Sequence, residues 1–136
     1  MNNSFDWSEY IRSDYVRRKL GETFSEVLAR YLDDISAATG IRQKDISVIS
    51  GIESSMITKY KNGVRKPSLY TLVVICISMR LTSERSKYLL YLMGYILNDC
   101  EEHRIYKLFL EGCAFNENYS VENFKLMFFE HGYAVE

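Results

Sequence analysis

Proline and glycine are scarce in this chain of 136 residues, which holds one proline and seven glycines. So few backbone breakers, together with frequent Leu, Ile and Tyr, favour an all-α fold. No apolar run approaches the roughly 18 residues that a membrane-spanning helix needs, so no membrane contact is expected. The first ten residues, MNNSFDWSEY, lack the charged-then-apolar plan of a secretory signal.

Cysteine is also rare, and its three copies are irregularly spaced. An odd number of this kind indicates free thiols in a reducing compartment, of which the cytoplasm is the simplest. Cys100-x-x-His103, followed by Cys113 and His131, mixes the sulfur and imidazole ligands that zinc accepts. The last two are single residues without a second paired motif, so packed cysteines and surface histidines are the preferred interpretation. We expect no metal and no cofactor.

Signals of catalysis are missing as well. The sequence has no Gly-rich phosphate loop, no nucleophile motif and no carboxylate pair tied to a pocket. The eleven tyrosines are better explained as core and interface residues than as reactive groups. The chain is therefore not expected to be an enzyme.

Net charge is close to zero, at −1, but it is unevenly distributed. Residues 41–70 hold six Lys/Arg against two Asp/Glu, and residues 71–98 hold three against one. Residues 1–40 hold five against seven, and residues 99–136 hold three against eight. A basic centre between acidic ends is typical of nucleic-acid binding, and the acidic end would limit binding to arbitrary DNA.

Helical spacing of apolar residues continues along most of the chain. The expected helices are one from the capping box Thr23-x-x-Glu26 to Gly40, then 42–50, 54–61, one from the cap Ser68 through Arg80, one from the cap Ser83 to about Leu97, one opened by Asp99-x-x-Glu102, and one from the cap Ser120 to Gly132. We expect three parts: an N-terminal arm or short helix (1–22), a DNA-binding domain (23–97) and a C-terminal helical extension (98–136).

The most informative stretch runs from Gln43 to Pro67 and has the layout of a helix-turn-helix. Apolar Ile46 and small Ser47 would let two helices approach, and Gly51 would supply a left-handed backbone at the turn. The second helix would bury Ile52, Ile57 and Tyr60, with Met56 partly buried. Its outward residues would be Ser54, Ser55, Thr58 and Lys59.

This segment resembles the lambda-repressor/Cro-like helix-turn-helix family of bacterial and phage regulators (the XRE type). The resemblance covers about Phe24 to Leu81 and rests on Gln43, Gly51-Ile52, Asn62-Gly63 and Lys66-Pro67-Ser68. It implies a five-helix DNA-binding domain. Three positions depart from the family pattern: Arg42 replaces a capping Ser or Thr, Ile49 replaces a polar residue, and Lys61 replaces an acid whose ion pair to the first helix would be lost.

The outward residues of the second helix are the candidates for reading base edges in the major groove. They are Ser54, Ser55, Thr58 and Lys59. Each also has a plainer interpretation: Ser54 could merely cap the helix, Thr58 could be ordinary surface, and Lys59 could be a solvated lysine.

Phosphate contacts are expected on both sides of that helix. By the resemblance, Gln43 would contact the DNA backbone at the start of the helix expected at 42–50, with Lys44 as a weaker candidate. Asn62, Gly63, Arg65 and Lys66 form a loop whose N–H groups and cations suit phosphate, although a helix C-cap with solvated charges is the alternative.

The expected function is sequence-specific binding of double-stranded DNA by a transcriptional regulator, a repressor rather than an activator. Because one recognition helix reads few base pairs, we expect a homodimer on a two-fold operator. The candidates for its interface are the helix ending near Leu97 and the aromatic residues Trp7, Tyr10, Phe124, Phe128 and Phe129. The alternative is a protein-binding or antitoxin-like module on the same scaffold, with the acidic extension as a possible partner site.

Overall fold

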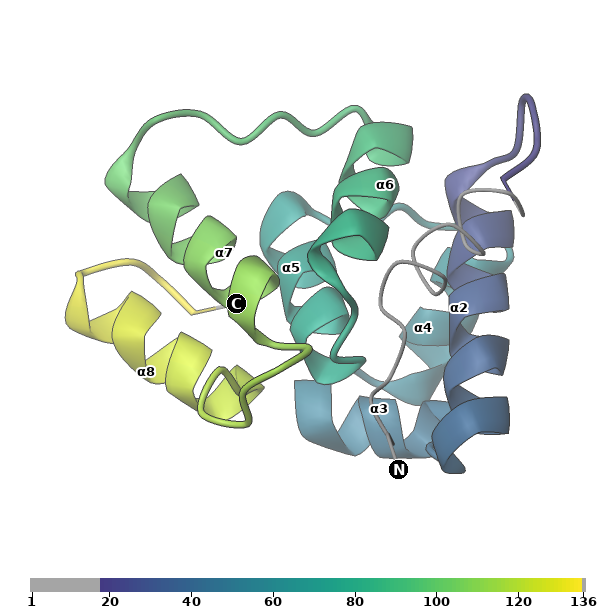
Figure 1. The fold of residues 1–136 in the computed structure, drawn as a ribbon, viewed down its shortest axis with the longest axis horizontal. Coiled ribbons are helices and arrows are strands. Elements are labelled where there is room, and N and C mark those ends of the chain that lie inside the picture. Colours follow the sequence, from purple (N-terminus) through teal and green to yellow (C-terminus); the bar gives the residue numbers. More distant parts are fainter. Residues whose placement is uncertain (1–17, 136) are drawn as a thin grey trace, which may run out of the picture.

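A computed structural model describes residues 18–135, and every regular element in that range is a helix (Figure 1). There are seven helices there and no strand, which confirms the expected all-α class. The helices are α2 (Phe24–Thr39), α3 (Gln43–Ser50), α4 (Ser54–Lys61), α5 (Leu69–Ser78), α6 (Ser83–Met93), α7 (Glu101–Gly112) and α8 (Val121–Glu130). Of the expected N-terminal arm, residues 1–17 lie outside the described residues, as does the interface candidate pair Trp7 and Tyr10.

Capping residues begin three of these seven helices where the sequence predicts. The Thr23 hydroxyl accepts a hydrogen bond from the Glu26 N–H at 3.2 Å, and the Glu26 carboxylate accepts one from the Thr23 N–H at 3.3 Å. This reciprocal pair satisfies two donors that the first turn would leave unpaired. Ser68 and Ser120 also cap as predicted, accepting from the N–H groups of Thr71 and Asn123.

Two helix starts were predicted one residue off. Thr82, not Ser83, caps α6, because its hydroxyl accepts the Arg85 N–H at 3.3 Å. At α7 the N-cap is Cys100 rather than Asp99. The Asp99 carboxylate instead accepts a hydrogen bond from Arg104 at 2.7 Å, so it is engaged by a charged partner and does not cap the helix.

Two helix ends were predicted too late. Helix α5 ends at Ser78, not Arg80, and α6 ends at Met93 rather than near Leu97. Gly94 takes φ +76° and donates its N–H back to Leu90 and Tyr91, which closes α6 with a left-handed residue. The apolar residues beyond it lie in an extended connection, where Ile96 is 78% exposed.

The core is centred on α5, in which every residue from Leu72 to Ser78 is buried. Helix α2 packs against α4 and α6 on one side of the molecule, and α7 and α8 pack against α5 on the other (Figure 1). The buried apolar residues form a single cluster that runs from Phe24 to Phe128. This cluster crosses the predicted boundary at residues 97/98, so the extension shares the core of the preceding helices.

Aromatic rings join the extension to this core. Phe124 and Phe128 of α8 lie with ring centroids 5.7 and 5.2 Å from Tyr70 of α5, and Tyr106 of α7 completes the group. Phe124 is fully buried and Phe128 is 3% exposed, so neither offers the dimer surface that the sequence suggested. Phe129, at 70% exposed, is the aromatic residue of α8 that remains on the surface.

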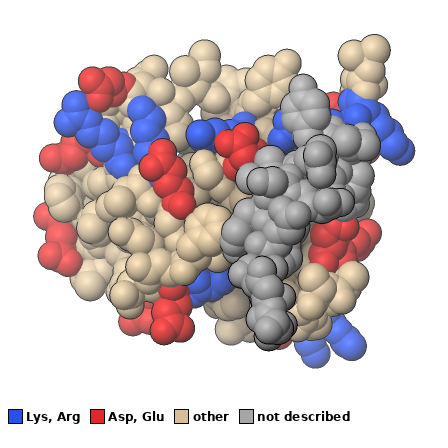
Figure 2. All heavy atoms as spheres, viewed as in Figure 1, with Lys and Arg blue, Asp and Glu red and all other residues tan. Residues whose placement is uncertain are grey.

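The charges of the extension are mixed on its visible face. Figure 2 shows Lys and Arg side chains beside acidic ones at its upper left, where α7 begins. Among residues 18–135, none of the helices combines the length and the apolar character that a membrane crossing requires.

Candidate nucleic-acid interface

Helices α3 and α4 meet at a tight turn of the kind that the sequence predicts. Gly51 has φ +76° and donates its N–H to the Ser47 carbonyl at 2.9 Å, while the Ser47 hydroxyl donates to the carbonyl of Ile52. Ile46 and Ile57 are buried at the contact between the helices. A residue with a Cβ would be strained at Gly51, so the glycine fixes where the second helix starts.

The Gln43 side chain ties the two helices together at their outer edge. Its Nε2 donates to the Ser54 carbonyl at 2.9 Å, to the Ser54 hydroxyl at 3.0 Å and to the Thr58 hydroxyl at 2.8 Å. Its Oε1 accepts from Lys61 Nζ at 2.9 Å. One amide thus holds α4 at both its first and its last turn, and a phosphate contact by Gln43 would replace one of these bonds.

Lys61 therefore has a role that sequence reasoning missed. The family pattern predicted only the loss of an ion pair at this position, whereas the Lys61 ammonium group donates to the side-chain amide oxygen of Gln43. Eighteen residues separate the two, so helical spacing gave no signal of the pair.

The four candidate base-reading residues lie on one exposed side of α4. Ser54, Ser55, Thr58 and Lys59 are exposed, Met56 is partly buried, and Ile57 and Tyr60 point into the core. The hydroxyls of Ser54 and Thr58 accept hydrogen bonds from Gln43, and each keeps its own O–H to donate. The described part of the chain leaves this surface open.

Glu53 is a further candidate that the sequence analysis did not consider. It is the N-cap of α4, makes no side-chain cap hydrogen bond and is exposed next to Ser54. A carboxylate at the base-reading end of a recognition helix can accept from the cytosine amino group and repels phosphate. Its position directly after Gly51-Ile52 is the signal that could have identified it.

The backbone N–H groups of the loop after α4 were expected to bind phosphate, but they cap the helix instead. The N–H groups of Asn62, Gly63, Val64 and Arg65 all donate to carbonyls of the last turn of α4, at 3.0 to 3.3 Å. They satisfy the end of the helix and are not free for phosphate. The side chains of Asn62, Arg65 and Lys66 are exposed, as is Lys44 on the first turn of α3, so these groups remain available for phosphate.

The zinc interpretation finds no support in the geometry of the described residues. Cys113 is buried, with its thiol 3.4 Å from the Leu81 carbonyl, and burial raises its pKa to about 11. His103 Nδ1 accepts the Asn98 N–H at 2.8 Å. Within residues 18–135, no three His, Cys, Asp or Glu side chains are placed to hold a metal ion together.

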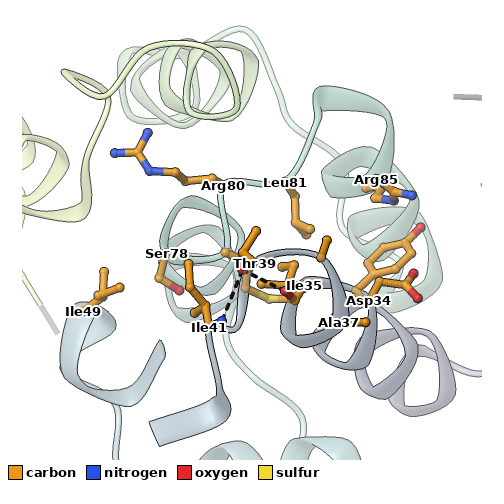
Figure 3. A pocket seen from close by; sticks show the side chains of 13 residues that line it. Asp34, Ile35, Ala37, Thr39, Ile41, Ile49, Ser78, Arg80, Leu81 and Arg85 are labelled. Atoms are coloured by element: carbon orange, nitrogen blue, oxygen red, sulfur yellow. Dashed lines mark hydrogen bonds between the residues drawn. The ribbon is translucent and has the colours of Figure 1, made fainter. Parts of the chain in front are cut away.

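A pocket of about 620 Å³ lies between the second half of α2, the end of α3 and the α5–α6 connection (Figure 3). Ile35, Ile41, Ile49, Met79 and Leu81 give it a mainly apolar wall. None of the predicted DNA-contacting residues lines it. Its chemistry suits an apolar group and not a phosphate backbone.

Comparisons with models of protein families, with curated proteins and with solved structures find no match for this chain.

Proposed function

We propose that this chain binds double-stranded DNA with sequence preference, placing α4 in the major groove and α3 across the backbone. In this proposal α2 to α6 form a five-helix domain of the lambda-repressor type. Ser54, Ser55, Thr58 and Lys59 read base edges, and the side chains of Gln43, Lys44, Asn62, Arg65 and Lys66 lie along the phosphates. Gly63, whose N–H is bonded to the Tyr60 carbonyl, only shapes the loop that carries these cations. Such a protein regulates transcription. It represses when its binding site overlaps a promoter, because a protein bound there blocks access to the promoter.

The Gln43 bridge is the observation that carries this proposal. It fixes α4 against α3 through Ser54, Thr58 and Lys61, while Ser55 and Lys59 stay exposed between those points. A helix that is held rigidly and yet presents hydroxyls and an ammonium group outward fits base recognition. The cations of the following loop lie at its end, where a strand of DNA would pass.

A single α4 contacts only a few base pairs, so useful specificity requires two copies. We propose a homodimer on an operator with two-fold symmetry and half-sites about 34 Å apart. Selection of bound fragments from random duplex DNA should yield an inverted repeat. A consensus without symmetry, together with a monomer by light scattering on that DNA, would contradict the dimer.

The DNA-binding proposal is tested with substitutions that separate affinity from sequence choice. Arg65→Ala with Lys66→Ala should weaken binding to all duplexes, and the slope of log K against log salt should fall by about 2, since two phosphate contacts are lost. Ser55→Arg should change the preferred base instead.

Lys87→Ala with Arg104→Ala serves as the control, because it removes two exposed cations that lie on α6 and α7, outside the proposed interface. If the loop variant and this control retain DNA equally, the proposed interface is wrong.

The alternative function is recognition of a protein partner on the same scaffold. Val48 is 83% exposed and Ile49 is 48% exposed at consecutive positions of α3, and Ile49 also lines the apolar pocket. Adjacent apolar side chains beside a hollow fit a protein surface better than DNA. Val48→Lys should leave DNA binding intact under the first proposal and abolish partner binding under the second.

A further inference from the structure

Lys125 connects the C-terminal extension to the turn of the helix-turn-helix. It lies on α8, and its ammonium group donates to the carbonyl oxygen of Ser50 at 3.1 Å. Ser50 is the last residue of α3, where carbonyl groups have no partner within the helix and the helix dipole is negative. The extension therefore supplies a cation to the C-terminal end of the first helix of the motif.

The position of Lys125 is fixed by the packing of its neighbours. Phe124 directly precedes it, Phe128 follows one turn later, and both rings pack on Tyr70 of α5. Helix α8 is thus anchored on the core by its aromatic side, and the lysine extends from this anchor toward the turn. A Cβ atom on Gly51 would lie only 3.3 Å from Lys125 Nζ, so turn and ammonium group are in close contact.

Lys125 is one of the residues that line a pocket of about 220 Å³ beside the turn. It is lined by the turn residues Ser50, Gly51 and Ile52 and by residues of α4 and α5. Since space remains beneath the turn, tight packing alone does not hold the turn in place. The charged hydrogen bond from α8 is a direct constraint on it.

We infer that Lys125 is a positioning residue for DNA recognition and that α8 belongs to the DNA-reading unit. By holding the end of α3, Lys125 fixes the backbone from which α4 starts, and so the angle at which Ser55 and Lys59 meet the groove. This inference rests on the proposed DNA-binding function. Anything that displaced α8 would loosen the motif without touching DNA itself.

The test compares Lys125→Met with Lys107→Met. Both lysines are partly buried on the extension and both donate to a backbone carbonyl, but Lys107 contacts Asn98 and not the motif. Lys125→Met should weaken binding to the selected operator about tenfold, the loss expected for a hydrogen bond with a charged donor. Lys107→Met should stay within about twofold, and Lys125→Arg should restore most of the affinity.

The salt dependence of binding separates positioning from phosphate contact. The slope should be the same for the native chain and for Lys125→Met; a slope smaller by about 1 would place Lys125 on the DNA and overturn the inference. Equal affinities of the Lys125 and Lys107 methionine variants would also overturn it.

Amide hydrogen exchange provides a measurement that does not depend on DNA. In Lys125→Met the Gly51 N–H should exchange faster, whereas amides in the centre of α5 should not change. If the native chain binds no duplex, the proposed function fails, and this exchange result decides on its own whether Lys125 holds the turn.

Discussion

At the scale of single residues, Glu22 is a buried carboxylate whose charge the surrounding side chains stabilise. Its side chain is 2% exposed, and Arg30 Nη1 donates to it at 2.8 Å. The Tyr88 hydroxyl of α6 donates to the same carboxylate, and the Arg18 guanidinium lies 3.9 Å from the centre of the Tyr88 ring. The hydrogen bonds from Arg30 lower the pKa of Glu22 to about 2, although burial opposes the shift.

This pKa predicts how stability depends on pH. Because the pKa is below its ordinary value of 4.5, folding favours the charged form. The resulting contribution to the free energy of unfolding is complete above about pH 4.5 and disappears as the pH falls toward 2. Glu22→Gln should lower the free energy of unfolding at pH 7 by roughly 1–3 kcal/mol, the contribution of hydrogen bonds that involve charged groups.

Urea unfolding at several pH values measures this effect. The difference between the native chain and Glu22→Gln should shrink between pH 4.5 and pH 2, while Glu111→Gln, which alters an exposed carboxyl, should match the native chain throughout. A Glu22→Gln difference that stays constant down to low pH would show that the carboxylate is not stabilised by its charge.

At the scale of the helices, Gly112, the last residue of α7, occupies a position where the usual preference of a helix for alanine over glycine should be reversed. Gly112 lies in a helix, where alanine is normally more favourable by about 1 kcal/mol. A Cβ atom at this position would overlap the ring of Tyr119, which itself packs edge-on against Phe109 with centroids 5.3 Å apart. The ring cannot move away freely, so Gly112→Ala should destabilise the protein by roughly 1–3 kcal/mol.

A double-mutant cycle isolates this steric cause. In a Tyr119→Ala background the added methyl group has space, and Gly112→Ala should become neutral or stabilising by up to about 1 kcal/mol. Thermal unfolding of the four proteins gives the coupling. An equal effect of Gly112→Ala in both backgrounds would rule out the clash.

The sequence predicted the helices better than it predicted their contacts. Capping residues such as Thr23, Ser68 and Ser120 and the turn at Gly51 could be found because their signals are local. Helix α6 was overextended because apolar residues continue past Gly94, and apolar spacing does not report a left-handed backbone.

For the candidate site, the sequence identified the exposed side of α4 and the cations of the following loop. The two contacts that hold the motif, Lys61 to Gln43 and Lys125 to Ser50, join residues 18 and 75 positions apart. Such pairs depend on how the helices dock, and no periodic pattern encodes them.

At the scale of the whole molecule, the continuous core predicts that the extension and helices α3 and α4 unfold together. Phe124 is fully buried in α8, between Tyr70 of the preceding helices and Phe109 of α7. Helices that share buried rings in this way lose their packing in the same event. A separate domain at residues 98–136 would instead melt on its own.

Phe124→Ala should therefore lower the stability of the entire chain by about 3–5 kcal/mol, the cost of emptying a large buried site. Calorimetry should show one transition at a lower temperature, and the Gly51 amide in the turn between α3 and α4 should lose protection together with amides of α8. Phe129→Ala is the matched control, because this ring on the same helix is 70% exposed and its loss should change stability by less than about 0.5 kcal/mol. Two transitions, with only the extension sensitive to Phe124→Ala, would mean that α8 folds independently of the motif, and Lys125 could not then hold the turn in the way inferred above.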